Sequence, residues 1–302
     1  MTKNRINNVI RNICIRFLEE DNMKIAVVSM RPFIGDKKAN IEKMKKYINK
    51  TKAEMYVFGE LALTGYPIKD EIRDLSETTD GPSIKHMKKI AKEKNCYLCF
   101  GMALKDEKIE GLNHNAAVMI HPNGKVDYYH KWFLPTFGPF EEKIFWDEGE
   151  NITICDTKFG KIGLIICYDL FFPELCKAYS LLGADIIICL SASPSVSRKY
   201  FEAILPARAI ENTTFMIYSN IVGTQDDLVF WGGSQIYDPL SNLVVKAPYF
   251  KESIITADLD LNQIKIARAN RPVIRDIRPE IYNDLYHLAR YHILPENKKH
   301  KP

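Results

Sequence analysis

The chain has 302 residues, of which 46% are hydrophobic and 26% are charged, the composition of a globular domain that buries a core. Its 42 Lys and Arg residues against 38 Asp and Glu leave a net charge of only +4, and the positive residues are scattered, which argues against nucleic-acid binding. No apolar run approaches the roughly 20 residues that span a bilayer. No Ser/Gly-rich linker divides the sequence, so we expect one large soluble domain.

Seven cysteines, an odd number, occur in a sequence without a secretory signal, and most of them fall in apolar, strand-like runs. Reduced thiols in a cytoplasmic protein fit this pattern best. Cys96 and Cys99 have the spacing of zinc ligands, but no second pair accompanies them, so packing in the core is the better interpretation. We expect no metal and no cofactor.

Residues 1–22 are predicted to form a separate N-terminal extension, because the stretch MKIAVVSM, which begins at Met23, is typical of a first core strand. Apolar residues recur at helical spacing from Ile6 to Leu18, which predicts an amphipathic helix. We expect this helix to pack on the body or on a neighbouring subunit, and a true start at Met23 is the alternative. The acidic run at 19–21 argues against a transit peptide.

Strands and helices alternate in the first half of the body. Predicted strands at 23–30, 53–58 and 96–104 alternate with helices around 41–48 and from Ser83, which we expect to cap the second helix. This alternation favours parallel strands joined by helices.

A turn signal at Pro122-Asn123-Gly124 separates two further strands and predicts an antiparallel hairpin at 115–130. The second half continues with a helix to about 183, a strand at 184–191, a helix at 200–212, a strand at 214–221 and an antiparallel set at 233–237, 243–246 and 253–259. Two mixed sheets packed face to face with helices outside would accommodate these elements. We therefore expect an α/β fold of four layers, an α-β-β-α sandwich.

The stretch GKIGLIICYDLFFPE, residues 160–174, places Cys167 where a short buried strand ends and a helix begins. The unpaired N–H groups and the dipole at a helix start stabilise negative charge, so this position favours a thiolate and suits a nucleophile. The alternative is one more buried apolar cysteine.

Two other stretches favour the nucleophile. Residues 55–67, MYVFGELALTGYP, form a predicted strand that ends at Glu60, and a carboxylate there is costly to desolvate unless it has a partner or a task. Residues 130–145, HKWFLPTFGPFEEKIF, place Lys131 among aromatic residues and prolines rather than in a solvated run of charges.

With Glu60, Lys131 and Cys167 in this order, the sequence resembles the nitrilase superfamily of carbon-nitrogen hydrolases, whose Glu-Lys-Cys triad falls in three motifs of this form. The resemblance covers residues 23 to about 280. It implies the four-layer sandwich and hydrolysis of a non-peptide carbon-nitrogen bond through a thioester on the cysteine.

The resemblance also implies a role for each residue. Glu60 would be the general base, Cys167 the nucleophile, and Lys131 with the backbone N–H of Tyr168 would hold the oxyanion. Glu142 matches a second glutamate that many family members place beside the lysine, and we expect it to orient that lysine. A solvated carboxylate is the alternative for Glu142.

Further residues are expected to shape the substrate pocket because they flank these motifs or end the strand after the cysteine strand, on the sheet edge where ligands collect. They are Tyr66, Trp132, Phe137, Tyr168, Ser191 and Ser193. Arg208 and Glu211 stand three residues apart on one predicted helix, where a structural salt bridge is the favoured interpretation over a substrate contact.

Residues 223–234, GTQDDLVFWGGS, and 271–280, RPVIRDIRPE, resemble the glutaminase domain of glutamine-dependent NAD synthetases. The sequence has no synthetase domain or pyrophosphate loop, and CYDLFFPE at Cys167 is closer to stand-alone amidases. We therefore expect an amidase acting on a small aliphatic or glutamine-like amide. An N-carbamoyl amide hydrolase and a nitrilase would use the same triad, and a non-catalytic binding module is the alternative from another class.

The last segment, residues 281–302, carries apolar residues such as Ile281, Leu285 and Leu288 that are costly to leave exposed. We expect this tail to pack on the body or on a neighbouring subunit. Together with the resemblance, it predicts a homodimer or a larger homo-oligomer.

Overall fold

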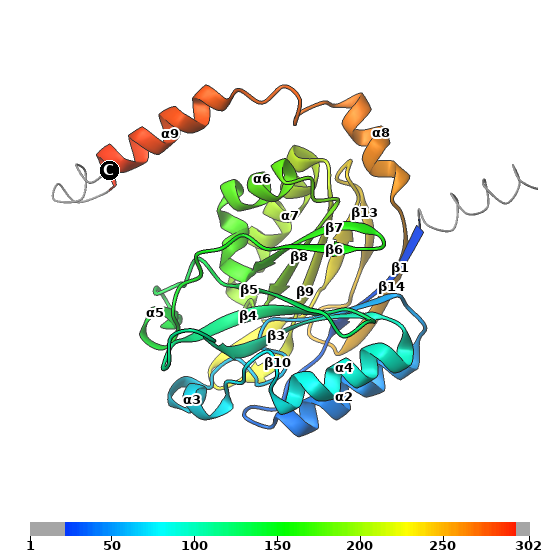
Figure 1. The fold of residues 1–302 in the computed structure, drawn as a ribbon, viewed down its shortest axis with the longest axis vertical. Coiled ribbons are helices and arrows are strands. Elements are labelled where there is room, and N and C mark those ends of the chain that lie inside the picture. The colour runs from blue at the N-terminus through cyan, green and yellow to red at the C-terminus, as the bar shows by residue number, and fades with distance from the viewer. Residues whose placement is uncertain (1–21, 294–302) are drawn as a thin grey trace, which may run out of the picture.

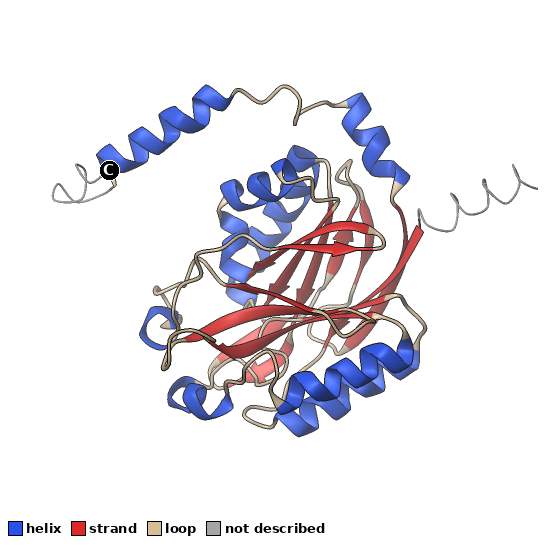
Figure 2. Ribbon diagram, in the orientation of Figure 1, coloured by secondary structure: helices blue, strands red, loops and turns tan. Residues whose placement is uncertain are grey.

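The computed structural model describes residues 22–293, which form two six-stranded sheets lying face to face with helices outside them (Figures 1 and 2). The first sheet has the order β14 (Ser253–Asp260), β1 (Asn22–Ser29), β2 (Met55–Phe58), β3 (Tyr97–Lys105), β4 (Asn113–Ile120), β5 (Val126–His130). The second has the order β13 (Leu243–Lys246), β12 (Gln235–Tyr237), β9 (Phe215–Asn220), β8 (Ile186–Ser191), β7 (Gly160–Ile166), β6 (Ile154–Thr157).

Helices cover both outer faces. The first sheet carries α2 (Lys37–Lys50) and α4 (Pro82–Lys94), and the second carries α6 (Pro173–Leu181) and α7 (Arg198–Asn212) (Figure 1). The smaller elements are η1 (Lys69–Glu71), α3 (Ile72–Leu75), α5 (Glu142–Phe145), η2 (Cys167–Phe171), η3 (Ser195–Ser197) and the hairpin of β10 (Val222–Gln225) and β11 (Leu228–Trp231). The expected four-layer α-β-β-α sandwich is confirmed.

Strand β1 contributes side chains to two hydrophobic clusters, one on each face of the first sheet. Successive side chains of a strand point to opposite faces. Ile25 and Val27 therefore join the cluster between the two sheets, while Ala26 and Val28 join the cluster beneath α2 and α4. Both faces are covered, so the strand is an almost continuous apolar run rather than an alternating one.

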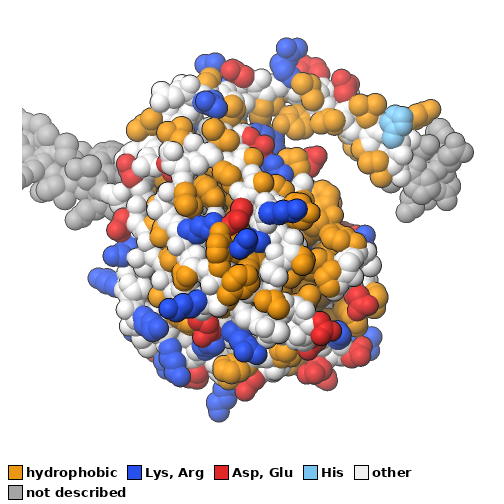
Figure 3. Space-filling model, turned by 180° about the vertical axis from the view of Figure 1, so that it is seen from behind, with side chains coloured by type: hydrophobic (Ala, Val, Ile, Leu, Met, Phe, Trp, Pro, Cys, Tyr) orange, Lys and Arg blue, Asp and Glu red, His pale blue; other side chains and the backbone are white. Residues whose placement is uncertain are grey.

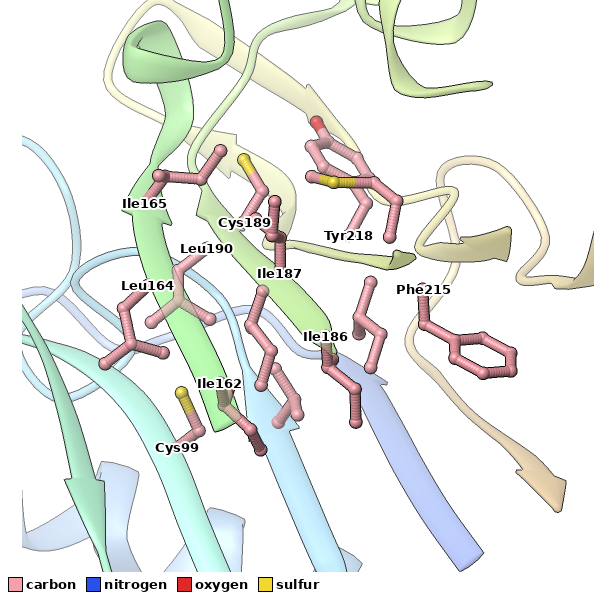
Figure 4. Close-up of a cluster of buried hydrophobic side chains, with 14 of the residues drawn as sticks. Cys99, Ile162, Leu164, Ile165, Ile186, Ile187, Cys189, Leu190, Phe215 and Tyr218 are labelled. Atoms are coloured by element: carbon pink, nitrogen blue, oxygen red, sulfur yellow. The ribbon is translucent and has the colours of Figure 1, made fainter. Parts of the chain in front are cut away.

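The cluster between the sheets is the larger core of the molecule. Figure 4 shows part of it, with Cys99 from the first sheet and Ile162 and Leu164 from the second. Each of these side chains is fully buried. Complete burial of a Leu or Ile side chain stabilises a fold by about 1.5–3 kcal/mol, so this core holds rigid the strands that carry the site described below.

Most of the predicted elements are present. The hairpin expected at 115–130 is β4 and β5, and the strand expected at 243–246 is β13. The prediction that Ser83 caps a helix is wrong. Gly81 is the N-cap residue of α4, while the Ser83 hydroxyl donates a hydrogen bond of 2.8 Å to Glu77.

The two ends of the chain differ from the body. The predicted helix at 1–22 lies outside the described residues, apart from Asn22, which begins β1. At the other end, α8 (Asn262–Asn270) is followed by α9 (Pro279–His292), which extends away from the body (Figure 1). Within residues 22–293 no helix is long and apolar enough to cross a membrane.

The arm formed by α9 buries none of its residues, and half or more of Ile281, Leu285 and Leu288 is exposed. Figure 3 shows hydrophobic side chains along this arm and on the body below it. Of the two arrangements expected for the tail, the described part does not pack on the body. Packing on a neighbouring subunit stays a prediction.

Candidate active site

The three residues singled out from the sequence all follow strands of the facing sheets. Glu60 comes two residues after β2, Lys131 directly after β5, and Cys167 directly after β7. All three are buried in the structure, with Glu60 and Lys131 fully enclosed and Cys167 6% exposed. The sandwich therefore brings together, at one end of its two sheets, residues that are 36 or more positions apart in the sequence.

Three donors hold the Glu60 carboxylate. Its Oε1 accepts hydrogen bonds from Lys131 Nζ at 2.8 Å and from Asn115 Nδ2 at 2.7 Å, and its Oε2 accepts one from the backbone N–H of Ala192 at 2.6 Å. Burying a carboxylate is tolerable only with such partners. These contacts fix both oxygens in one orientation. The sequence analysis did not identify Asn115, which lies in β4.

Lys131 lies between two carboxylates. Its Nζ is 2.8 Å from Glu60 Oε1 and 2.7 Å from Glu142 Oε2. Burial alone would lower the pKa of Lys131, but the carboxylates of Glu142 and Glu60 outweigh burial and raise it above its usual value. Lys131 therefore stays an ammonium ion, a fixed positive charge in a site shielded from water.

Glu142 begins the short helix α5 and is only 4% exposed. It contacts Lys131 and accepts a hydrogen bond of 2.7 Å from the Tyr66 hydroxyl, so the alternative of a solvated carboxylate does not hold. Burial raises the pKa of Glu142 to about 7 against the opposing effect of Lys131. The neighbouring Glu141 is exposed.

Cys167 lies at a sharp turn between β7 and η2. Its φ is +48°, in the left-handed region that non-glycine residues rarely adopt. Such a conformation costs about 1–3 kcal/mol and persists where the surroundings enforce it, often at functional sites. The turn ends β7 at Ile166, so that Cys167 is the first residue of η2 rather than part of the strand.

The prediction that this position favours a thiolate is wrong for the site as it stands. Burial, followed by the nearby Glu60 carboxylate, raises the pKa of Cys167 well above its usual value, although Lys131 and a hydrogen bond with Ser191 act in the opposite direction. Helix-start electrostatics is weaker here than desolvation. Cys167 therefore rests as a thiol and needs a base to remove its proton.

A second buried carboxylate, Asp169, secures this turn. It accepts hydrogen bonds from the backbone N–H of Ile166 at 2.9 Å, the backbone N–H of Phe133 at 2.9 Å and the Tyr129 hydroxyl at 2.8 Å. Asp169 thus joins the turn at Cys167 to the segment that follows Lys131. The sequence analysis missed it, although a carboxylate inside the apolar run CYDLFF is a signal that it must be paired.

Two cavities adjoin these residues, and we name them by the groups they reach. The thiol cavity, of about 290 Å³, is lined by Cys167 and, among the predicted pocket residues, by Phe137, Tyr168 and Ser193. The carboxylate cavity, of about 300 Å³, is lined by Tyr66 and Glu142. Each cavity thus reaches one group of the site, the thiol of Cys167 or the carboxylate of Glu142.

The two remaining predicted site residues line neither cavity, although Ser191 forms a hydrogen bond with Cys167. Ser191 is buried at the end of β8, where its hydroxyl accepts a hydrogen bond of 3.2 Å from Tyr218. Trp132 lines neither of the two cavities, and its indole N–H donates to the Asn151 carbonyl at 3.2 Å. The structure therefore separates Trp132 from the predicted pocket.

The ion pair expected between Arg208 and Glu211 is confirmed at 2.9 Å, and Arg208 also donates to the Leu170 carbonyl at 3.0 Å. Arg208 thereby ties α7 to η2, a structural role. Among residues 22–293, the structure groups no three His, Cys, Asp or Glu side chains in a way that could hold a metal ion.

This chain belongs to the carbon-nitrogen hydrolase family, which it matches over residues 24–269. It is therefore a hydrolase, as its resemblance to the nitrilase superfamily indicated. Among its relatives, a probable nitrilase of Schizosaccharomyces pombe is 30% identical over 270 residues, which cover 86% of this chain and 97% of that protein. The crystal structure of a carbon-nitrogen hydrolase from Helicobacter pylori matches with a TM-score of 0.81 and 27% identity, over 88% of this chain and 98% of that one.

The glutaminase-like resemblance also has a counterpart among the relatives. The glutamine-dependent NAD(+) synthetase of Aquifex aeolicus is 30% identical over 257 residues, which cover 82% of this chain but 44% of that protein. This chain thus spans less than half the length of that relative.

Proposed function

We propose that this protein hydrolyses a small-molecule primary amide to a carboxylic acid and ammonia through a thioester on Cys167. The observation that carries the proposal is the buried set of contacts in which Lys131 joins Glu60 to Glu142 next to a thiol at a strained turn. A fixed ammonium ion, a fixed carboxylate and a thiol supply an electrophile, a base and a nucleophile.

In the first half of the reaction, Glu60 takes the proton from the Cys167 thiol as the sulfur attacks the carbonyl carbon of the amide. The raised pKa of Cys167 makes this base necessary. The negative charge that develops on the carbonyl oxygen is stabilised by the Lys131 ammonium and the backbone N–H of Tyr168, an arrangement of the oxyanion-hole type. The C–N bond then breaks, the protonated Glu60 gives its proton to the nitrogen, and ammonia leaves.

In the second half, a water molecule attacks the thioester while Glu60 again accepts a proton. The C–S bond breaks, the acid leaves, and the proton returns to the sulfur, so that the site is restored. Asn115 and the backbone N–H of Ala192 position Glu60 through both halves, because each holds one of its oxygens. Glu142 keeps Lys131 in place with the help of the Tyr66 hydroxyl.

Hydrolysis of a nitrile is a second candidate, since the same groups can add to a C≡N bond and a relative of similar length is named a probable nitrilase. The deciding experiment incubates the pure protein with matched amides, N-carbamoyl compounds and nitriles and measures ammonia release. We expect amides to give the highest kcat/KM. The Cys167→Ala variant should give no ammonia above background, while Cys155→Ala, which removes a buried thiol from β6, should stay active. Ammonia release by Cys167→Ala at the wild-type rate would overturn the proposal.

We also propose that the protein works in the cytoplasm as a homodimer or larger homo-oligomer. The cysteines of the described residues are all free and buried, which suits a reducing compartment. The exposed apolar side chains of α9 support self-association. Light scattering should give a mass of at least twice 34.8 kDa, and replacing Leu285 and Leu288 by Glu should lower that mass. A wild-type protein that stays monomeric at working concentration would contradict this proposal.

A further inference from the structure

The thiol cavity also carries information about the acyl group of the substrate, on the assumption that the proposed function holds. The carbonyl carbon must come within bonding distance of the Cys167 sulfur. Cys167 lines the thiol cavity and does not line the carboxylate cavity. The acyl chain attached to that carbon is therefore expected to extend into the thiol cavity.

Aromatic rings make up most of this cavity's wall. They come from the loop after Lys131, from η2 and from α7, and are Phe137, Phe140, Tyr168, Phe171, Tyr200 and Phe201. The rings of Phe137 and Tyr168 pack edge to face at 5.2 Å between centroids, and those of Phe171 and Phe201 do the same at 5.2 Å. These contacts between segments make the wall a preformed apolar surface.

Charge is lacking in the same wall. Within the described part of the chain, the residues lining the thiol cavity include no Asp, Glu, Lys, Arg or His. Lys199 lies close by, with its Nζ 5.0 Å from the centre of the Tyr200 ring, but it is not part of the lining. A substrate that brought a carboxylate or an ammonium group into this cavity would lose hydration without gaining a partner, which is strongly unfavourable.

The volume of about 290 Å³ admits a group of substantial size. An apolar protein cavity of about 150 Å³ is enough to hold benzene. The thiol cavity therefore has room for an aromatic ring together with the short chain that joins it to the amide carbon.

We propose that the thiol cavity is an acyl pocket for an uncharged apolar group, so that neutral amides with an aryl or alkyl chain are the preferred substrates. Of the two substrate types expected from the sequence, this favours the aliphatic amide over the glutamine-like one. Phe137, which is 52% exposed at the edge of the pocket, becomes a residue that helps to determine specificity.

The test compares amides that differ only at the far end of the acyl chain. Pentanamide, the monoamide of glutaric acid and 5-aminopentanamide are similar in length and carry no charge, a negative charge and a positive charge, and glutamine and 3-phenylpropanamide complete the set. We expect kcat/KM for pentanamide and 3-phenylpropanamide to exceed that for each charged amide by at least about thirtyfold. Glutamine or either charged amide being turned over as well as pentanamide would overturn the inference and leave the proposed function standing.

A matched pair of variants tests the role of the wall. Phe137→Arg places a cation at the edge of the cavity, and we expect the ratio of kcat/KM for the glutaric monoamide to that for pentanamide to rise by at least about tenfold. Phe33→Arg makes the same change at a residue that is also 52% exposed but does not line the thiol cavity, and its ratio should stay at the wild-type value. An unchanged ratio in Phe137→Arg, or an equal rise in Phe33→Arg, would count against the inference.

A binding measurement separates this inference from the proposed function. If the wild type releases ammonia from none of the amides, carbamoyl compounds or nitriles, the proposed function has failed. Calorimetric titration of the Cys167→Ala variant with 3-phenylpropanamide and with the glutaric monoamide then decides the inference alone. Binding of the neutral compound at least about tenfold tighter supports an apolar pocket, and equal or weaker binding of it overturns the pocket assignment.

Discussion

Two buried carboxylates flank Cys167, and their partners differ. One of the hydrogen bonds that Glu60 accepts comes from a cation, the Lys131 ammonium. Asp169 accepts hydrogen bonds from two backbone N–H groups and one hydroxyl, all neutral donors. A carboxylate held beside an ammonium ion and a thiol is placed for proton transfer, whereas one held by backbone groups determines the shape of the chain. We therefore expect substitution of the first to remove chemistry and substitution of the second to remove stability.

The largest effect is expected for Glu60→Gln, which keeps the shape of the side chain and loses the base. Turnover of an amide should fall by roughly 10³-fold or more, because both halves of the reaction need Glu60. An activated ester should partly rescue acylation, so an acyl-enzyme should accumulate. Intact-mass spectrometry should show one added acyl group, and peptide mapping should locate it on Cys167.

The matched control for this change is Glu93→Gln on α4, an exposed glutamate on the outside of the first sheet. It should leave turnover at the wild-type level. An adduct on Cys176 or Cys189, or no adduct while turnover persists, would mean that the nucleophile or the base is misassigned.

The next effect concerns Asp169. Replacing it by Ala leaves three donors without an acceptor, two of them buried and the Phe133 N–H partly buried, and each such group costs about 1–3 kcal/mol. We expect the free energy of unfolding to fall by at least about 3 kcal/mol in urea titration. Asp169→Asn should cost less, since its amide oxygen can still accept. The exposed Asp156→Ala of β6 is the control and should change stability by at most about 0.5 kcal/mol. A free energy of unfolding of Asp169→Ala equal to that of the wild type would contradict the structural role of Asp169 and its contrast with Glu60.

The sequence predicted Glu60, Lys131 and Cys167 more readily than it predicted Asn115 and Asp169. Glu60 and Cys167 each follow an apolar strand, Lys131 lies among aromatic residues and prolines, and the motifs around the three fall in a recognisable order. Asn115 is one polar residue in a buried strand, and its contact with Glu60 depends on how β3 pairs with β2 on one side and with β4 on the other. The apolar run around Asp169 indicates a buried carboxylate. Its hydrogen-bond partners, however, come from β5, from the loop after Lys131 and from its own turn, and only the folded chain brings them together.

The predictions for Cys167 and for the C-terminal tail show where a local sequence pattern is not sufficient. The expected thiolate at Cys167 followed from a local rule about helix starts, whereas desolvation is set by the whole sandwich around the sulfur. The prediction that the tail packs on the body or on a neighbouring subunit followed from its apolar residues. The described part does not pack on the body, and packing on a neighbouring subunit stays a prediction, because the pattern in α9 does not specify which surface covers it. The local sequence pattern predicted the helices, the strands and the residues at the strand ends. The pKa of Cys167 depends instead on burial by segments that are distant in the sequence.

A smaller effect separates Glu142 from Asp169 through the pH dependence of stability. Burial raises the pKa of Glu142 from 4.5 to about 7 and that of Asp169 from 3.8 to about 6. A carboxyl group whose pKa is raised in the native state binds more protons there than in the unfolded state when the pH lies between its two pKa values. The free energy of unfolding that this group contributes is therefore lost as the pH rises through that window. As the pH rises from 4.5 to 7, Glu142 should lower the free energy of unfolding of the wild type by at most about 3 kcal/mol, and Glu142→Gln should not show this decrease.

For Asp169 the corresponding decrease in the free energy of unfolding should fall between pH 3.8 and 6, and Asp169→Asn should not show it. Urea titrations of wild type and both variants at pH values across 4 to 8 measure these windows. Parallel curves for the wild type and Glu142→Gln would show that Glu142 does not titrate in that range.

The smallest effect is expected from metal removal, which should leave the rate unchanged. A catalytic metal ion stabilises developing negative charge and activates a nucleophile. Here Lys131 provides a permanent positive charge, because Glu142 and Glu60 keep its pKa above the usual value, and in the proposed mechanism Glu60 deprotonates Cys167. Both roles are therefore filled by side chains in contact with one another. Dialysis against a strong chelator, followed by the ammonia assay with and without added zinc or manganese, checks this. Activity that disappears on dialysis and returns with either metal would show that Lys131 does not by itself stabilise the negative charge that develops in the reaction.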